Sequence, residues 1–311
     1  MKINILMSTY NGQQFLEEQI ESIQNQTFTD WTLYIRDDGS TDQTRQIINR
    51  FVKQDHRIKC INSDSDKNLG VIDNFYTLLK YDKADFYFFS DQDDIWLPEK
   101  VQLTLEAIRN QVQDKPVLVY TDLKVVDQNL NVLHESMIKT QSDHANTHLV
   151  EELTENTVTG GTMMINHALA KLWENQPNIL MHDWFLAIIA AAKGELIFLQ
   201  VPTELYRQHA NNVLGARTLK KRMQHWIRPH QLIRKYWWLI QSSQKQASYL
   251  LEMNLDENEK TLVENYVNLL EQGLKQRMNI LKRYGFRKNR QFHTFVFKTL
   301  VITKFGYRRE K

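Results

Sequence analysis

The sequence predicts an α/β fold, in which a Rossmann-like, mainly parallel sheet is followed by an α-helical C-terminal region. Up to about residue 206, short β-branched or aromatic runs alternate with amphipathic stretches. Alternation at this spacing is typical of right-handed βαβ units, which build parallel sheets. After about Gly215 strand candidates become rare, and long helical stretches rich in Lys, Arg, Gln, Leu and Trp follow. We therefore expect two parts, residues 1–214 and residues 215–311.

The periodicity of the apolar residues predicts each element in turn. Short apolar runs indicate buried strands, and apolar positions three or four residues apart indicate helices. The expected strands are residues 2–8, 31–36, 58–62, 86–90, 117–126, 158–165 and 195–201. The expected helices lie around residues 15–23, 44–52, 71–81 and 183–192, with one more directly after Pro98. Proline suits the first turn of a helix, which supports the start of that last element.

Composition is that of a soluble globular protein. Hydrophobic residues make up 42% and charged residues 24% of the 311 residues. The single cysteine, Cys60, excludes an intramolecular disulfide framework and fits a reducing cytosol. The N-terminus resembles neither a signal peptide nor a membrane span, and no apolar run reaches about 18 residues. We expect a cytoplasmic protein.

The charge is divided unevenly along the chain. Up to Tyr206 there are 17 Lys and Arg against 30 Asp and Glu, whereas from Arg207 onward there are 22 against 7. An asymmetry of this size indicates different partners for the two parts. A solvated helical face is the alternative explanation for the basic part.

Four polar motifs follow the ends of the first four expected strands. They are residues 8–12, 37–42, 68–70 and 90–94. In an open parallel sheet, ligands bind beyond the carboxyl ends of the strands. Any one motif alone could be a helix cap, for which Ser40 or Asp42 is well suited. The recurrence of all four predicts a ligand site at this edge, with Asn11, Asn68 and Gly70 among its candidate contacts.

The fourth motif carries three carboxylates, those of Asp91, Asp93 and Asp94, directly after an aromatic strand. Carboxylates this close repel one another unless a cation or a proton intervenes. Mg²⁺ is typically held by one or two carboxylates together with substrate phosphates. Such a cation can neutralise a departing nucleoside diphosphate. A turn capped by an aspartate is the alternative, and Asp94 suits either role.

These motifs together resemble glycosyltransferase family 2, which has the GT-A fold. The resemblance is carried by Thr9-Tyr10-Asn11, by Asp-Asp-Gly-Ser-Thr-Asp at 37–42 and by Ser-Asp-Gln-Asp-Asp-Ile-Trp at 90–96, and it covers roughly residues 2–212. It implies that Thr9, Tyr10 and Asp38 contact the nucleotide base and ribose. It also implies an Asp-x-Asp pair at Asp91 and Asp93, with Asp93 as a direct ligand of Mg²⁺ or Mn²⁺, and inversion at the transferred sugar.

Inversion by a single displacement needs a general base for the acceptor hydroxyl. The resemblance points to Asp183, at the start of a predicted helix. We expect the helix N-terminus to keep this aspartate ionised and oriented, a role compatible with simple capping. Upstream, Gly160 and Gly161 would let an acceptor approach the backbone closely, although a β-bulge also explains them.

The segment 206–212, Tyr-Arg-Gln-His-Ala-Asn-Asn, ends the region of resemblance. By resemblance, Arg207 is a candidate partner of the diphosphate and His209 a candidate third metal ligand. A hydrogen-bonded structural histidine is the alternative for His209.

Together with His-Asp-Trp at 182–184, the motifs at 90–96 and 206–212 resemble bacterial rhamnosyltransferases of cell-wall or O-antigen polysaccharide synthesis. That resemblance implies dTDP-L-rhamnose as the donor and a lipid-linked saccharide as the acceptor. A UDP-hexose donor stays open, because thymine and uracil present the same pairing edge. A catalytically silent module that binds nucleotide sugars or glycans is a further alternative, which the complete set Asp91, Asp93 and Asp183 disfavours.

The basic C-terminal part suits an anionic membrane surface, because basic residues there are interleaved with tryptophans. The residues concerned are Arg217, Lys220, Lys221, Arg222, Trp226, Arg228, Arg234, Lys235, Trp237 and Trp238. We expect peripheral attachment to the inner face of the cell membrane. The alternative is a helical dimerisation domain with internally packed tryptophans. Nucleic-acid binding is disfavoured by the acidic N-terminal part and the lack of a recognition motif.

Overall fold

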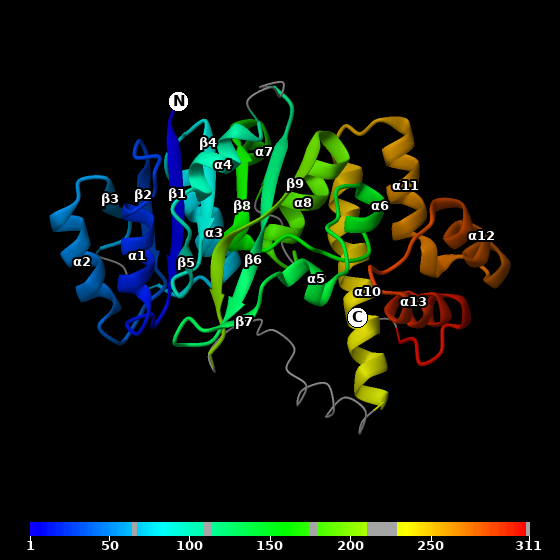
Figure 1. Cartoon of the computed structure of the whole chain (residues 1–311). Coiled ribbons are helices and arrows are strands. Elements are labelled where there is room, and N and C mark those ends of the chain that lie inside the picture. Colours follow the sequence, from blue (N-terminus) through cyan, green and yellow to red (C-terminus); the bar gives the residue numbers. More distant parts are fainter. Residues whose placement is uncertain (64–66, 109–113, 175–178, 210–228, 309–311) are drawn as a thin grey trace.

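A computed structural model describes residues 1–63, 67–108, 114–174, 179–209 and 229–308. A single sheet runs through the N-terminal part, and helices cover both of its faces (Figure 1). Within the described residues the strand order is β3-β2-β1-β4-β8-β6-β9-β5, and β7 pairs with β6 outside this path.

The first four strands form the parallel half of the sheet. They are β1 (Ile3–Thr9), β2 (Thr32–Asp37), β3 (Ile58–Cys60) and β4 (Phe86–Ser90). Helices α1 (Leu16–Gln24), α2 (Thr44–Gln54) and α3 (Val71–Tyr81) connect them, as predicted. Because the strands are parallel, their carboxyl ends meet at one edge, where Thr9 pairs with Asp37 and Met7 with Ser90.

The second half of the sheet is mixed, so the expectation of a mainly parallel sheet holds only for the first half. Its strands are β5 (Ile95–Trp96), β6 (Val117–Val126), β7 (Val132–His134), β8 (Met163–Asn166) and β9 (Glu195–Arg207). Strand β8 lies antiparallel between β4 and β6. The strand expected at 158–165 is shorter in the structure, because η1 (Gly160–Thr162) occupies its middle. The strand expected at 195–201 is longer and continues to Arg207.

Helices lie between the strands of this half along the chain. They are α4 (Lys100–Glu106), α5 (Met137–Gln141), α6 (Leu149–Glu152), α7 (His167–Leu172) and α8 (His182–Lys193). Helix α8 is buried along almost its whole length and packs at the centre of the core. A helix that is apolar on all sides must be covered on all sides. The N-terminus of α8 is thereby fixed in the interior.

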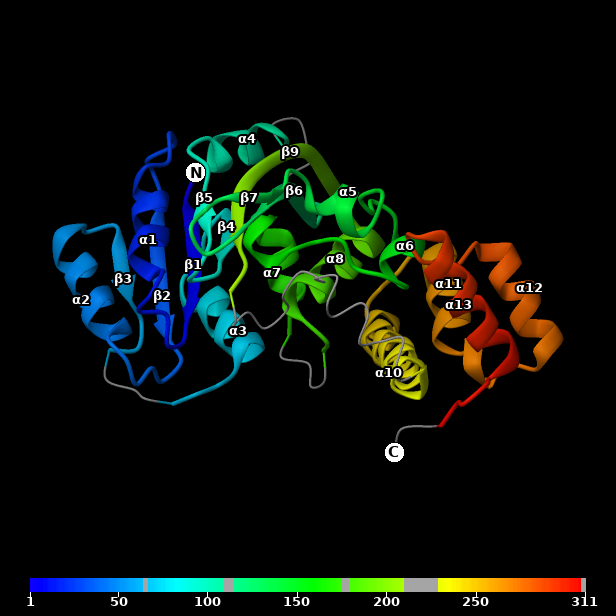
Figure 2. The same ribbon diagram turned by 60° about the horizontal axis from the view of Figure 1, so that its bottom comes forward.

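The C-terminal part consists of helices that pack against the N-terminal part. They are α10 (Pro229–Ser248), α11 (Glu257–Val267), α12 (Leu274–Tyr284) and α13 (Gln291–Thr303), with short turns η2 (Tyr249–Glu252) and η3 (Leu269–Glu271). Figure 2 shows α10 to α13 on the side of the molecule opposite β3. One continuous hydrophobic core joins residues of both parts. The Asn289 amide, for instance, donates to Glu155 at 2.7 Å. None of the helices in the described ranges is long and apolar enough to cross a membrane.

Candidate active site

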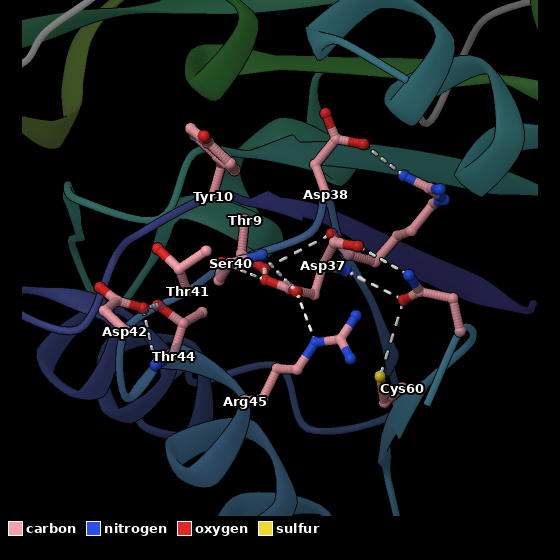
Figure 3. Close-up of polar contacts among 12 residues, drawn as sticks. Thr9, Tyr10, Asp37, Asp38, Ser40, Thr41, Asp42, Thr44, Arg45 and Cys60 are labelled. Carbon is pink, nitrogen blue, oxygen red and sulfur yellow. Dashed lines mark hydrogen bonds and ion pairs between the residues drawn. The ribbon is translucent and has the colours of Figure 1, made fainter. Parts of the chain in front are cut away.

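Asp37, at the end of β2, is the centre of a closed hydrogen-bond network (Figure 3). Its carboxylate accepts hydrogen bonds from the Thr9 hydroxyl at 3.2 Å, the Ser40 amide at 2.9 Å and the Arg45 guanidinium at 2.8 Å. Burial alone would raise the pKa of Asp37, but these donors hold it below its ordinary value. Asp37 is therefore an ionised anchor for the loop.

The Asp38 side chain points away from Asp37 (Figure 3). Its carboxylate pairs with Arg36 at 2.7 Å and accepts the backbone amides of Leu69 at 2.7 Å and Gly70 at 2.8 Å. Asn68 donates to its backbone carbonyl. Gly70 has φ of 79°, a conformation that favours glycine, and it precedes the first residue of α3. Asp38 thus joins two of the predicted motifs.

Tyr10 and Asn11 join the first motif to the others. The Tyr10 backbone exchanges hydrogen bonds with the Gln92 side chain, at 2.8 and 2.9 Å. The Asn11 amide donates to Ser40, and its side-chain oxygen accepts from the Thr41 amide. The prediction that the four motifs meet at one edge of the sheet is confirmed. The Tyr10 side chain is 51% exposed there, whereas Thr9 is buried.

The fourth motif is a cluster of crowded carboxylates. Burial, followed by the charges of Asp93 and Glu204, raises the pKa of Asp91 to about 8. Burial and the same neighbouring charges raise the pKa of Asp94 well above its ordinary value. One oxygen of Asp94 accepts the Arg207 amide at 2.9 Å, while the other is buried without a hydrogen-bond partner. This loop lacks the compensation that Asp37 and Asp38 have.

Asp93 and His209 lie directly beside each other, although 116 residues separate them. The Asp93 carboxylate is 2.8 Å from His209 Nε2. The His209 ring also packs on Phe15, with ring centroids 4.9 Å apart. A carboxylate and an imidazole are a donor pair that suits a divalent metal ion. Within the described residues, however, no three His, Cys, Asp or Glu side chains are grouped as a complete metal site.

Arg207 is buried beneath this pair and holds protein groups rather than facing the ligand edge. Its guanidinium donates to Glu18 at 2.6 Å, to the Asp93 carbonyl at 3.0 Å and to the Gln128 carbonyl at 2.8 Å. It also lies 4.5 Å from the Phe15 ring centroid. To reach a diphosphate the side chain would have to leave these acceptors. In this structure Arg207 fixes the loop that carries Asp93.

Asp183 lies in the first turn of α8 and is 9% exposed. Its carboxylate accepts hydrogen bonds from the backbone amides of Trp184 and Gly160. Asn156 Nδ2 also donates to it, at 3.4 Å. Burial nevertheless raises its pKa to about 7. The expectation that the helix N-terminus keeps Asp183 ionised therefore fails below about pH 7, because burial outweighs the amide donors. A carboxylate with this pKa is suited to accept a proton near neutral pH.

A buried ion pair, which the sequence did not reveal, lies between these elements. Lys100 on α4 donates to Glu204 on β9 at 2.5 Å and to the carbonyl of Gly161, and both charged side chains are fully buried. A Cβ on Gly161 would meet Glu204 at 2.6 Å, and one on Gly160 would meet His182 at 2.9 Å. The two glycines therefore allow close packing within the protein, and the approach of an acceptor to their backbone stays a prediction.

Two further buried groups near Asp183 also escaped the sequence analysis. His182 packs against Phe89 and Trp173, neither of its ring nitrogens has a hydrogen-bond partner, and burial lowers its pKa to about 3. Burial raises the pKa of Glu152 to about 8, and the charge of Asp183 adds to this shift. His182 is thus neutral. In the sequence, the local signal that could have indicated His182 is its position directly before Asp183 at the start of a predicted helix.

Comparison with known proteins decides the family. The sequence profile of Glycosyl transferase family 2 matches residues 4–173, which is more than half of the chain. The chain belongs to glycosyltransferase family 2. The matched region contains the strands β1 to β4 and all of the carboxylates at their ends.

Among its relatives, this family 2 glycosyltransferase is similar to the dTDP-rhamnosyl transferase RfbG of Shigella flexneri. The two are 32% identical over 223 residues, which are 68% of this chain and 74% of that protein. It is also similar to the Escherichia coli UDP-Glc:alpha-D-GlcNAc-diphosphoundecaprenol beta-1,3-glucosyltransferase WfgD. That pair is 30% identical over 128 residues, or 41% of this chain and 47% of that protein.

Solved structures share the fold. S. aureus TarS 1-349 in complex with UDP-GlcNAc matches 91% of this chain and 80% of its own, with a TM-score of 0.61 at 18% identity. The mannosyltransferase PcManGT from Pyrobaculum calidifontis, in complex with GDP-Man and Mn²⁺, matches 96% and 86%, with a TM-score of 0.50 at 12% identity. The family 2 glycosyltransferase described here thus has the GT-A fold with a helical C-terminal region.

Proposed function

We propose that this family 2 glycosyltransferase transfers L-rhamnose from dTDP-L-rhamnose to a lipid-linked saccharide, with inversion, in bacterial surface polysaccharide synthesis. The observation that carries the proposal is the similarity to a dTDP-rhamnosyl transferase over two thirds of the chain. The aspartates at the carboxyl edge of the sheet supply the chemistry that such a transfer needs.

The donor nucleotide is proposed to bind at the ends of β1, β2 and β3. The Tyr10 ring is exposed and offers a surface for the base. Thr9 and Asp38 are buried in the loops that shape this edge, and Asn11, Asn68 and Gly70 hold those loops together. The base and ribose contacts predicted for Thr9, Tyr10 and Asp38 are parts of this proposal. The predicted diphosphate contact of Arg207 would require its side chain to leave Glu18 and the carbonyls of Asp93 and Gln128.

A divalent cation, Mg²⁺ or Mn²⁺, is proposed to bind beside the diphosphate. The residues fit such an ion, because Asp93 and His209 are already paired, and Asp91 lies in the same loop with a pKa raised partly by Asp93. Two or three protein donors leave room for phosphate oxygens, as Mg²⁺ usually requires. When bound, the ion would neutralise charge on the leaving diphosphate.

Asp183 is proposed as the general base. Its carboxylate takes the proton of the acceptor hydroxyl as the hydroxyl oxygen attacks the anomeric carbon. The bond from that carbon to the diphosphate oxygen breaks, and the nucleoside diphosphate leaves with the bonding electrons. A single displacement of this kind inverts the anomeric centre. Burial raises the pKa of Asp183 to about 7, which suits acceptance of a proton near neutrality.

A UDP-hexose is the alternative donor. It is favoured by the similarity to WfgD, whose name gives UDP-Glc as its donor, although that similarity covers only 41% of this chain. A transfer assay with dTDP-L-rhamnose, UDP-glucose, UDP-galactose and UDP-N-acetylglucosamine distinguishes the two. We expect turnover of dTDP-L-rhamnose to exceed that of every UDP-sugar by at least about tenfold. A preference for a UDP-sugar would refute the rhamnosyl assignment.

We propose that residues 1–214 form the catalytic unit and that the helices of residues 215–311 bring it to the inner face of the cell membrane, where a lipid-linked acceptor lies. Part of the predicted basic segment, residues 217–228, lies outside the described residues. Trp237 is 3% exposed, so it cannot face a membrane, whereas Trp238 is 47% exposed. Helical dimerisation remains the competing role for this region.

A further inference from the structure

Helix α13 buries apolar residues on its inner side and exposes two phenylalanines on its outer side, where Gln291, Thr299 and Thr303 are also exposed. Phe297, Leu300 and Val301 are buried against the protein. Phe292 and Phe295, one turn apart on the opposite side, are 61% and 68% exposed. The helix has a single charged residue, Lys298, among its 13 residues. A surface helix of a soluble protein normally carries polar and charged residues on its outer face. This face therefore indicates contact with an apolar partner.

The surroundings of α13 are strongly basic. Residues 272–309 contain eleven Lys and Arg and no Asp or Glu. Several of these are exposed, namely Lys275, Lys282, Arg283, Arg287 and Arg308. Phe305, directly after the helix, is 65% exposed. An exposed aromatic face within a field of positive charge is typical of helices that lie in the interface of an anionic bilayer.

Helix α10 adds to the same surface. It contacts α13 through Tyr236, whose hydroxyl lies within hydrogen-bond distance of His293, and Trp237 donates to the Phe305 carbonyl at 2.9 Å. On α10, Trp238 is 47% exposed, and Arg234 and Lys235 are exposed. In Figure 1 both α13 and the carboxyl ends of the parallel strands lie in the lower half of the view.

We propose that the outer face of α13, formed by Phe292 and Phe295 and continued by Phe305, inserts into the headgroup region of an anionic membrane. This proposal deepens the proposed function, because it names the surface that brings the enzyme to a lipid-linked acceptor. It rests on the proposed function, which assigns that acceptor. A second copy of the chain is a poorer occupant. Two copies joined by this face would bring two basic surfaces together, and like charges oppose association.

Flotation of the full-length protein with lipid vesicles tests the proposal. We expect binding to phosphatidylcholine vesicles that contain phosphatidylglycerol, release by high salt, and no binding to phosphatidylcholine alone. Burial of a phenylalanine side chain is favourable, because it removes apolar surface from water. The double variant Phe292→Ser/Phe295→Ser should therefore bind at least about tenfold more weakly, while Phe292→Trp/Phe295→Trp should bind as well as wild type.

The matched control is Tyr81→Ser, which removes another aromatic side chain, 56% exposed, from the catalytic part. Equal binding by wild type and the double serine variant would overturn the proposal, as would a lipid-free dimer that this variant dissociates. Metal-dependent hydrolysis of dTDP-L-rhamnose in solution, without acceptor or membrane, reports on the proposed function separately. The double serine variant should keep that hydrolysis within about twofold of wild type; loss of it in a folded variant would also contradict the assignment.

Discussion

Two acidic loops at neighbouring strand ends differ in how completely their carboxylates are compensated. After β2, Asp37 and Asp38 accept hydrogen bonds from arginines, hydroxyls and backbone amides. After β4, the pKa values of Asp91 and Asp94 are raised, and one buried oxygen of Asp94 has no hydrogen-bond partner. Both loops have the same residue type at the same edge of the sheet.

The difference indicates that the two loops have different roles, one in stability and the other in ligand binding. The β2 loop is complete by itself, so its aspartates contribute to the stability of the folded chain. The β4 loop, like Asp183, keeps carboxylates in a costly state that a ligand or a proton must relieve. Functional sites often store such unfavourable electrostatics at the expense of stability. Neutral substitutions should therefore lower stability in the β2 loop, and should leave stability unchanged or raise it in the β4 loop and at Asp183.

The largest effect is expected for Asp183→Asn. Loss of the general base should lower kcat by about a thousandfold. Because the fold raises the pKa of this carboxyl from 3.8 to about 7, the carboxyl costs the most stability above about pH 7, and that cost is relieved progressively as the pH falls from about 7 to about 4. The melting temperature of the variant at pH 8 should equal or exceed that of wild type. Single-turnover kinetics and calorimetry measure the two quantities, and a clearly lower melting temperature would contradict the assignment.

Next in size is Lys100→Met. Removal of one partner from a fully buried ion pair leaves Glu204 uncompensated, at a cost of about 4 kcal/mol in unfolding free energy. Urea unfolding measures it. The double variant Lys100→Met/Glu204→Gln should recover at least half of the loss, because no buried charge then remains unpaired. Additive losses in the double variant would show that the two side chains do not act as a pair.

A smaller effect is expected for Asp38→Asn. The variant leaves the buried Arg36 guanidinium without its carboxylate and weakens the link to Leu69 and Gly70, which should cost about 2 kcal/mol. The control Asp85→Asn alters a carboxylate at the opposite end of β4 that is 59% exposed, and should change little. If Asp38→Asn unfolds at the same urea concentration as wild type, the carboxylates of the β2 loop do not stabilise the folded chain.

The smallest effect concerns pH. Asp183 must be ionised to accept a proton, so kcat/KM should be constant above about pH 8 and fall about tenfold for each unit below its pKa of about 7. A rate profile from pH 5 to 9, at saturating metal, measures this. A rate that stays constant down to about pH 5 would mean that a group with an ordinary aspartate pKa acts as the base.

The sequence predicted what depends on local pattern. Strands at 86–90 and 117–126 occur with those bounds, and the four polar motifs meet as expected. The two-residue strand β5 is too short to show a period. The antiparallel direction of β8 depends on the long connection between β7 and β8, and the periodicity of apolar residues does not predict the course of a connection.

Contacts between distant residues were beyond the reach of sequence patterns. Lys100 and Glu204 are 104 residues apart, and neither lies in a motif that suggests a partner. Arg207 was identified as a candidate ligand by resemblance, but its burial follows from the extension of β9 and from Glu18 on α1. Trp237 seemed suited to a membrane, yet tertiary packing on Tyr307 covers it.

Metal-dependent turnover of Asp93→Asn tests the account most directly, because the uncompensated β4 loop is assigned to a ligand. Hydrolysis of dTDP-L-rhamnose is measured against Mn²⁺ concentration for wild type, Asp93→Asn and the control Asp85→Asn. We predict that Asp93→Asn loses at least about a hundredfold in turnover at every Mn²⁺ concentration while it unfolds no more easily than wild type. Equal turnover by wild type and a folded Asp93→Asn would contradict the assignment of the β4 carboxylates to the donor site.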